Sequence, residues 1–295
     1  LLYLIYIYKE IDSKKYINTD INVCGWIENF RVQKNGGIAF IALNDGSCVS
    51  SLQVILDPKT DEEKEKLDSI YEDGTKGVSI TVKGKLVESP ASGQVFELKG
   101  QELKILGKVD ASIYPITKKK LTLEHLRKFP HLRIRTKTLS AIARIRNVCA
   151  MATHGFFQKH NFKYVHTPVL TSNDCEGAGE TFDISNTLSD GEPFFGKPTN
   201  LTVSGQLHGE TYATALGDIY TFGPTFRAEN SNTPRHLSEF WMIEPEMCFI
   251  DFKDLMDITE DYIKFCLKGC LLQCKEEIEF FTKHYQSELL ESLTS

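Results

Sequence analysis

Between Ile21 and Gly107 the sequence alternates short apolar runs with turns that contain glycine, asparagine or aspartate. Runs of this kind, rich in branched and aromatic side chains, predict β-strands. Five are expected here, namely INVCGWIENFRV, IAFIALNDG, LQVILD, VSITVKGKLVE and VFELKGQELKIL. A charged segment with a helical pattern, DPKTDEEKEKLDSIYEDG, stands between the third and the fourth of them. Five strands in so short a segment predict a small β-barrel.

Three strands, a helix and two further strands follow one another in the order of an OB-fold. An OB-fold commonly binds single-stranded nucleic acid on its barrel face, where aromatic side chains stack on the bases. Because topology alone does not specify a ligand, a sheet-rich domain that binds another protein remains the alternative interpretation.

Length and composition suit a globular protein with one large or two moderate domains, since the chain has 295 residues of which 41% are hydrophobic. No apolar run approaches the roughly 20 residues that cross a bilayer, so no membrane span is expected. The opening LLYLIYIY lacks a cleavage-site pattern and is interpreted as a strand or a trimmed end. The eight cysteines lack the spacing of a zinc site or a disulfide framework, which indicates reduced thiols in a cytoplasmic protein.

Positive charge gathers in one segment, although the formal net charge of the chain is -6. Ten lysines and arginines lie between Lys118 and Arg146, with Glu124 as the single acid among them. Such a strip can neutralise the phosphates of a polyanion, or it can be a solvated helix face. Prolines within residues 111–137 favour a hinge or linker there.

After residue 137 helical and strand patterns alternate. KTLSAIARIRNVCAMATHGFFQKHN repeats apolar residues at spacings of three and four, as an amphipathic helix does. FKYVHTPVLT predicts a strand, and NLTVSGQLHGETYATALG predicts a strand that runs into a helix. The acidic segment after Phe252 is helical in pattern, and Cys266, Cys270 and Cys274 are interpreted as one of its apolar faces rather than as a metal site.

A predicted hairpin, TFGPTFRAENSNTPRHLSEFWMIEPEM, carries Arg227, Glu229, Glu244 and Glu246 in runs that otherwise resemble ordinary strands. Side chains two positions apart on a strand share a face and can look into one cavity. An arginine can grip a phosphate, a glutamate can accept from an amino group and the ring of Phe240 can stack on a base, which together are the requirements of ATP. An exposed sheet face with ordinary ion pairs is the alternative. The chain contains no phosphate-binding GxxxxGKS, GxxxxGKT or GxGxxG motif.

The segment GPTFRAENSNTPRHLSEFWMIEPEM closely resembles motif 2 of class II aminoacyl-tRNA synthetases, in the version found in the asparaginyl enzymes. FKYVHTPVLTSNDCEGAGETF resembles the motif 1 region with its proline at Pro168, and LTVSGQLHGE resembles the amino-acid-binding segment. VCGWIENFR, FIALNDGS and LQVILD resemble the amino-terminal anticodon-binding OB domain of that family. The resemblance covers about residues 20 to 290.

This resemblance implies an α+β fold with three parts. They are an OB-fold anticodon-binding domain over residues 1–110, a hinge over residues 111–137 and a class II catalytic domain with an antiparallel sheet over residues 138–295. The motif 1 resemblance also implies a homodimer, in which the long helix and the strand through Pro168 form the interface. Motif 3, with its second ATP-binding arginine and its Mg²⁺-binding acids, is not found before Ser295, so the C-terminal part of the catalytic domain is expected to be absent.

For the nucleotide, the resemblance implies four residues. Arg227 is the implied catalytic residue and binds the α-phosphate of ATP, while Glu229 contacts the adenine amino group. Phe240 stacks under the adenine, and His236 faces the triphosphate tail. For the anticodon, Phe40 is implied to stack on a base and Gln53 to hydrogen-bond to one, with Arg31 near the backbone; a place in the barrel core is the alternative for Phe40.

For the amino acid, the resemblance implies that Glu176 holds the α-ammonium group, with Gln206 beside it and Glu244 near the side chain. The aspartyl enzymes carry a lysine three residues after this glutamine, and here that position is Gly209. Loss of the cation disfavours an anionic substrate, and Glu210 or Glu244 can accept from a carboxamide. Asparagine is therefore the predicted substrate.

The implied reaction has two steps. The carboxylate of asparagine attacks ATP to form an aminoacyl-adenylate, and tRNA(Asn) then accepts the aminoacyl group. Alignment and neutralisation of the phosphate charge by Arg227 and Mg²⁺ can supply most of the acceleration. A catalytically inactive synthetase-like paralogue or fragment that binds tRNA or protein is the alternative, whereas the OB domain disfavours an asparagine-making relative of the aspartyl enzymes.

Overall fold

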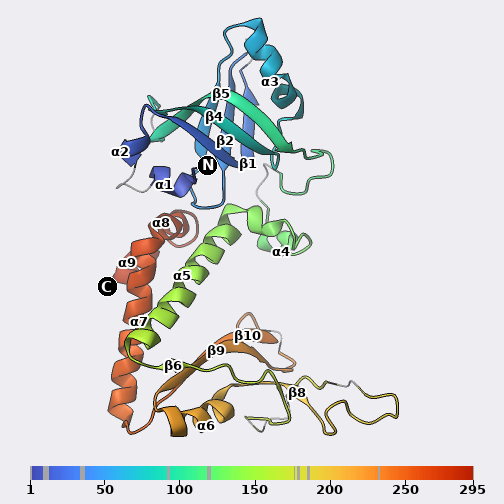
Figure 1. The fold of residues 1–295 in the computed structure, drawn as a ribbon, viewed down its shortest axis with the longest axis vertical. Coiled ribbons are helices and arrows are strands. Elements are labelled where there is room, and N and C mark those ends of the chain that lie inside the picture. The colour runs from blue at the N-terminus through green and yellow to red at the C-terminus, as the bar shows by residue number, and fades with distance from the viewer. Residues whose placement is uncertain are drawn as a thin grey trace. The chain divides into compact units, whose positions relative to one another are not determined.

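The computed structural model describes residues 2–8, 13–33, 37–91, 94–117, 121–175, 177, 180–184, 187–231 and 233–294. The chain forms two compact units (Figure 1). One consists of Leu1–Asn147 together with Cys270–Ser295, and the other consists of Val148–Gly269. Helices α5 (Lys137–Lys159) and α7 (Phe252–Gln273) each lie partly in both units.

The first unit contains a closed β-barrel with the strand order β1-β2-β3-β5-β4 (Figure 1). Its strands are Asp20–Val32 (β1), Ala39–Asn44 (β2), Leu52–Leu56 (β3), Ser79–Glu88 (β4) and Phe96–Gly107 (β5). Neighbouring strands pair antiparallel, except for β3 and β5, which pair parallel. Helix α3 (Asp61–Asp73) lies between β3 and β4 in the chain, so the predicted OB-fold order is confirmed.

The barrel core follows from the period of two along each strand. Alternate residues of β2 and β3 are fully buried, namely Ala39, Ile41, Leu43, Leu52, Val54 and Leu56. The residues between them are half-buried and lie on the outer side of the barrel. Helix α3 forms from a strongly charged segment because a capping box satisfies its first amides, in which the Thr60 side chain accepts from the Glu63 amide and the Glu63 side chain accepts from the Thr60 amide.

The first residues of the chain form helix α1 (Leu4–Tyr8), so the predicted strand is wrong there. Leu4 and Ile7, three positions apart, are fully buried in the barrel core, while Tyr3 and Tyr6 are exposed. A helix brings residues three apart to one face, whereas a strand would separate Leu4 from Ile7. The Leu4 amide also donates to the Asp45 carboxylate at 2.7 Å, which satisfies one amide at the start of the helix.

Five further short elements belong to the first unit: α2 (Ser13–Tyr16), α4 (Leu123–Leu126), the 3₁₀-helix η1 (Arg133–Arg135), α8 (Lys275–His284) and α9 (Leu289–Thr294). Helix α7 ends at Gln273, and Cys274 is the N-cap of α8. The prediction of one helix face through three cysteines is therefore wrong at Cys274, although Cys270 and Cys274 are both buried. Within the predicted basic strip, residues 118–120 lie outside the described residues.

The sheet of the second unit is built on a long hairpin (Figure 1). Strands β9 (Ile219–Phe226) and β10 (Glu239–Glu246) pair antiparallel over their whole lengths, and β6 (Lys163–Tyr164) joins the other edge of β9 in parallel. Strands β7 (Leu170–Thr171) and β8 (Asn200–Leu201) form a separate pair, and α6 (Gln206–Leu216) follows β8. The predicted single strand FKYVHTPVLT is therefore wrong, because Pro168, which has no N–H to donate, lies between β6 and β7.

Alternate side chains of β9 serve two different faces. Tyr220 is fully buried and stacks on Phe157 of α5 with 4.5 Å between the ring centroids. Ile219 and Thr221 point to the other side, where both lie against Gly209 of α6. The hairpin thus separates an aromatic core on one face from a more polar face toward α6.

Candidate active site

The loop of the hairpin begins where β9 ends, and the Arg227 amide donates to the Ser238 carbonyl at 3.1 Å. The Arg227 guanidinium carbon lies 5.4 Å from the centroid of the Phe240 ring. Its Nη1 is 3.9 Å from Glu229 Oε1, and Glu229 Oε2 is 3.8 Å from His236 Nε2. The structure therefore brings together all four residues that the sequence suggested for ATP.

The Glu229 carboxylate thus lies between a cation and an imidazole, and the cation lies over an aromatic ring. Arg227 and Glu229 are 28% and 29% exposed, so both can still meet a ligand. Ion pairs of nearly 4 Å between partly exposed groups contribute little to stability. Thr233 hydrogen-bonds through its hydroxyl to His236 Nδ1, which orients the imidazole.

A second group of polar residues lies on the face of the hairpin toward α6. Glu244 stands opposite Thr221 in the register, and its carboxylate accepts from Thr221 Oγ1 at 2.9 Å and from the Gly205 amide at 3.1 Å. The Ser204 hydroxyl also donates to Glu244. Gly205 is required by this close approach, because a Cβ there would lie 2.8 Å from Thr167 Oγ1 and 3.0 Å from Thr221 Oγ1. The glycine of the SGQ segment thus lets the chain pass over the carboxylate.

Glu246 was not selected as a site residue from the sequence, yet it joins this group. It lies opposite Ile219, two positions after Glu244 and hence on the same face. Burial, and then the nearby carboxylates of Glu210 and Glu244, raise the pKa of Glu246 to about 7. The sequence does show that Glu246 lies two positions after Glu244 on a predicted strand. This spacing does not reveal that the Glu246 side chain is partly buried. We call Glu210, Glu244 and Glu246 the acidic cluster.

Gln206 lies at the start of α6 beside the acidic cluster. Its Nε2 donates to Glu210 Oε1 at 2.9 Å, and its Oε1 accepts weakly from the Cys175 thiol at 3.9 Å. Gly209 is buried, and a Cβ there would lie 3.4 Å from Glu246 Cγ. Glu176, which the sequence suggested for the α-ammonium group, lies outside the described residues.

On the barrel, the three residues suggested for the anticodon lie on neighbouring strands. Arg31 stands opposite Phe40 in the register, and its guanidinium carbon is 4.9 Å from the centroid of that ring. Gln53 stands opposite Ala42, two positions from Phe40. Because the buried residues of β2 and β3 are the alternate ones, Phe40 and Gln53 both belong to the outer face. The alternative of Phe40 in the barrel core is therefore wrong.

Among the described residues, no group of three or more histidines, cysteines or acids is arranged to hold a metal ion. No helix in the described parts of the chain is both long and apolar enough to span a membrane.

Comparison with known proteins places the chain in a class. Residues 122–294 match the class II tRNA synthetases of the D, K and N group, and residues 21–106 match the OB-fold nucleic acid binding domain. Since the first match covers more than half of the chain, the chain belongs to the class II tRNA synthetase family.

Two relatives with similar sequences are both named asparagine–tRNA ligases. The chain is 49% identical to the asparagine–tRNA ligase of Protochlamydia amoebophila, over 96% of this chain and 62% of that protein. It is 47% identical to the asparagine–tRNA ligase of Treponema denticola, over 98% of this chain and 65% of that protein. The chain thus spans less than two thirds of the length of these relatives.

Solved structures show the same architecture. The asparaginyl-tRNA synthetase from Pyrococcus horikoshii complexed with asparaginyl-adenylate aligns with a TM-score of 0.77 at 25% identity, over 94% of this chain and 61% of that one. The asparaginyl-tRNA synthetase of Entamoeba histolytica aligns with the same TM-score of 0.77 at 22% identity, over 90% of this chain and 59% of that one, which supports the fold alone.

Proposed function

We propose that the whole protein is an asparagine–tRNA ligase, which activates asparagine with ATP and transfers it to tRNA(Asn). The observation that carries this proposal is the meeting of Arg227, Glu229, His236 and Phe240 on one hairpin, beside an acidic cluster. Relatives at 49% and 47% identity that are named asparagine–tRNA ligases support it.

In this proposal the hairpin binds ATP. The adenine ring stacks on Phe240, and its amino group donates to Glu229. Arg227, which lies over the same ring, binds the α-phosphate and stabilises the negative charge that grows there as the asparagine carboxylate attacks and pyrophosphate leaves. His236 faces the outer phosphates. The protein contributes mainly position and charge, because this displacement requires no covalent intermediate with the enzyme.

The acidic cluster is proposed to select asparagine over aspartate. Glu244 is held in place by Ser204, Gly205 and Thr221, so its carboxylate is a fixed acceptor for the NH₂ of a carboxamide. Burial and two carboxylates raise the pKa of Glu246, with no lysine or arginine among its described neighbours that lowers it. An aspartate side chain at this point would meet like charges, which costs binding energy. Gln206, and Glu176 outside the described residues, are proposed for the α-amino group.

Mg²⁺ is proposed to accompany ATP, where a divalent cation neutralises phosphate charge. The described residues offer no cluster of ligands for it, so none of them is assigned to the metal.

The proposal is tested by ATP–pyrophosphate exchange in the whole protein. Exchange is expected with asparagine and at least about 100-fold less with aspartate, because a like-charge contact costs several kcal/mol. Exchange driven by aspartate would overturn the choice of substrate. If neither amino acid drives exchange while the protein still binds tRNA, a synthetase-like binding protein without catalysis would be favoured.

The barrel is proposed to read the anticodon, with Phe40 stacked on one base, Gln53 bonded to another and Arg31 at the backbone. Phe40→Ala is expected to weaken binding of tRNA(Asn) about tenfold, since stacking of a base on an aromatic ring contributes roughly 1–3 kcal/mol. Adenylate formation should not change. Binding is measured by fluorescence anisotropy, with Leu106→Ala, which also shortens an exposed apolar side chain of the barrel, as the control. A variant that loses both tRNA(Asn) binding and adenylate formation would contradict this role of Phe40.

The remaining proposals concern the domain boundaries, the location and the oligomeric state of the protein. We propose an OB-fold domain over residues 1–110, a hinge over residues 111–137 and a catalytic domain from residue 138 onward, in a cytoplasmic protein. A homodimer is proposed from the motif 1 resemblance and from the exposure of Met151, Tyr164 and Leu170 on α5, β6 and β7. Light scattering on the whole protein distinguishes the dimer from a monomer.

The raised pKa of Glu246 predicts a dependence of stability on pH. Because the folded-state pKa of this acid is about 7, above its usual value of 4.5, the folded state holds the proton more tightly than the unfolded state does. Stability from this group is thus present at low pH and is lost as the pH rises toward and past 7. We expect the free energy of unfolding of Glu246→Gln to equal that of the wild type near pH 5. Near pH 8 it should be larger by on the order of 1 kcal/mol, a figure that already allows for solvent screening of this partly buried group.

Urea unfolding at several pH values measures this difference. Glu239→Gln, at the exposed start of the same strand, is the control and should show a pH dependence like that of the wild type. A difference between Glu246→Gln and wild type that shrinks as the pH rises would contradict the burial of a charged Glu246.

A further inference from the structure

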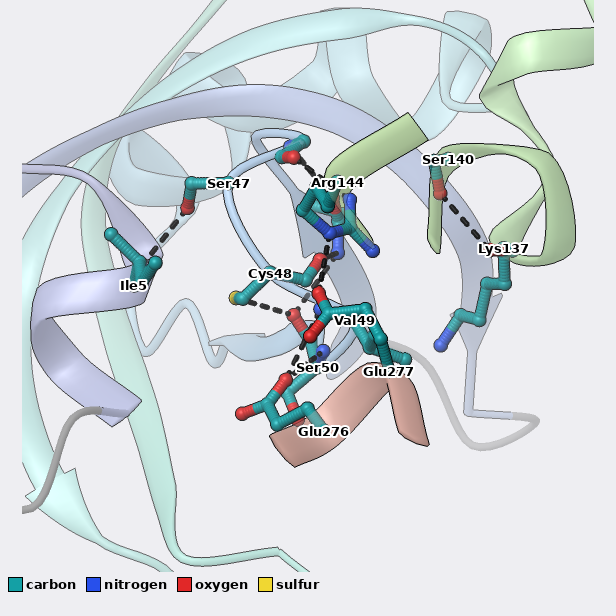
Figure 2. Close-up of polar contacts among 12 residues, drawn as sticks. Ile5, Ser47, Cys48, Val49, Ser50, Lys137, Ser140, Arg144, Glu276 and Glu277 are labelled. Carbon is teal, nitrogen blue, oxygen red and sulfur yellow. Dashed lines mark hydrogen bonds and ion pairs between the residues drawn. The ribbon is translucent and has the colours of Figure 1, made fainter. Parts of the chain in front are cut away.

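The loop between β2 and β3, residues 45–51, joins the two strands that carry Phe40 and Gln53. Its consecutive Val49 and Ser50 amides both donate to Glu276 Oε2, at 3.1 and 3.2 Å (Figure 2). Glu276 comes from the first turn of α8, 227 positions beyond Val49. One carboxylate oxygen from a distant helix thus holds two neighbouring amides of the loop.

A second contact ties the same loop to α5. Arg144 Nη1 donates to the Gly46 carbonyl at 3.0 Å. Arg144 Nε donates to Glu277 Oε1 at 2.6 Å (Figure 2). The side chains of Glu277 and Arg144 are only 7% and 20% exposed. An ion pair this short and this buried is screened little by solvent, and removal of one partner leaves a buried charge.

The loop itself has little freedom. Asn44 Nδ2 donates to the Cys48 and Ser50 carbonyls, and the Ser47 amide donates to Asp45. Since these bonds join the loop to itself and to the last residue of β2, a shift of Glu276 or Arg144 must move the loop as a body or break its contacts. The ends of β2 and β3 are covalently joined to that body.

We propose that Arg144, Glu276 and Glu277 are positioning residues for the anticodon-binding face of the barrel, a role that rests on the proposed function. They hold the loop between β2 and β3 against α5 and α8, so that Phe40 and Gln53 are ordered before RNA arrives. A surface that is ordered in advance loses less conformational entropy on binding and therefore binds more tightly. We call these three residues the loop clamp.

The clamp is tested with Glu276→Ala in the chain, and with Glu279→Ala as the matched control. Glu279 is exposed on the same helix, so its replacement changes the net charge equally without touching the loop. Hydrogen exchange is expected to become at least about tenfold faster at the Val49 and Ser50 amides of Glu276→Ala, because these amides lose their acceptor. Affinity for a tRNA(Asn) transcript is expected to fall about five- to tenfold, with ATP affinity equal to that of the control.

Glu276→Gln, which retains an acceptor oxygen, should restore part of the tRNA affinity. Unchanged exchange at Val49 and Ser50 would overturn the clamp itself. Faster exchange with tRNA affinity equal to that of Glu279→Ala would overturn the positioning role, since the contacts would then serve stability alone. A wild-type chain that binds ATP but no tRNA(Asn) would instead refute the proposed function on which the role rests.

Discussion

Arg227→Ala is expected to lower the rate of asparaginyl-adenylate formation by about 10³-fold. A guanidinium aimed at the developing phosphate charge acts in the same way as an oxyanion donor, whose loss costs about 10²- to 10³-fold. Arg227 also binds as a planar fork, which lysine does not reproduce, so Arg227→Lys should recover little of the rate. Single-turnover adenylate formation in the whole protein measures both effects.

Arg235→Ala is the matched control, because Arg235 lies exposed in the same loop and its loss changes the net charge equally. A comparable fall in rate for both variants would mean that the loop acts through general positive charge. A full rate for Arg227→Ala would contradict the proposed ATP site at Arg227 and Phe240.

Gly84→Ala is expected to destabilise the barrel by about 3 kcal/mol or more, which exceeds ordinary overpacking. A Cβ at Gly84 would lie 2.1 Å from the Lys99 carbonyl oxygen and 2.9 Å from Gly100 Cα. Both atoms belong to the backbone of β5, so relief requires separation of β4 from β5. Loss of that ladder would open the closed barrel.

Gly107→Ala is the control for this prediction. It lies in the same strand pair, but the nearest atom to its added Cβ is the Ser79 hydroxyl at 2.9 Å, which belongs to a short side chain. Urea unfolding followed by Trp26 fluorescence, in a Trp241→Phe background that leaves one tryptophan, reports on the barrel alone. Equal unfolding midpoints for the two variants would contradict the steric account.

Much of the architecture was predictable because it depends on local order. The period of two in the barrel strands and the helical pattern of the charged segment before β4 are properties of neighbouring residues. The hairpin from Ile219 to Glu246 was predictable for the same reason, and its motif pointed to the four residues that the structure brings together.

The errors arose where distant contacts decide the structure. Residues 4–8 form a helix because Leu4 and Ile7 both enter the barrel core, which strand propensity does not reveal. The segment around Pro168 divides into two strands because β6 pairs with β9 whereas β7 pairs with β8. At Cys274 the chain turns from one helix into the next although the apolar spacing continues.

The sequence by itself determined the class of the protein, its barrel and the residues that meet on its hairpin, because these depend on residue type and short spacing. Only the tertiary structure decided the pKa of Glu246 and which amides donate hydrogen bonds to Glu276. A pKa depends on burial and on charges from other elements, and the loop clamp joins residues 227 positions apart. Such properties exist only once the chain has folded, because no local pattern encodes the distance between two remote side chains.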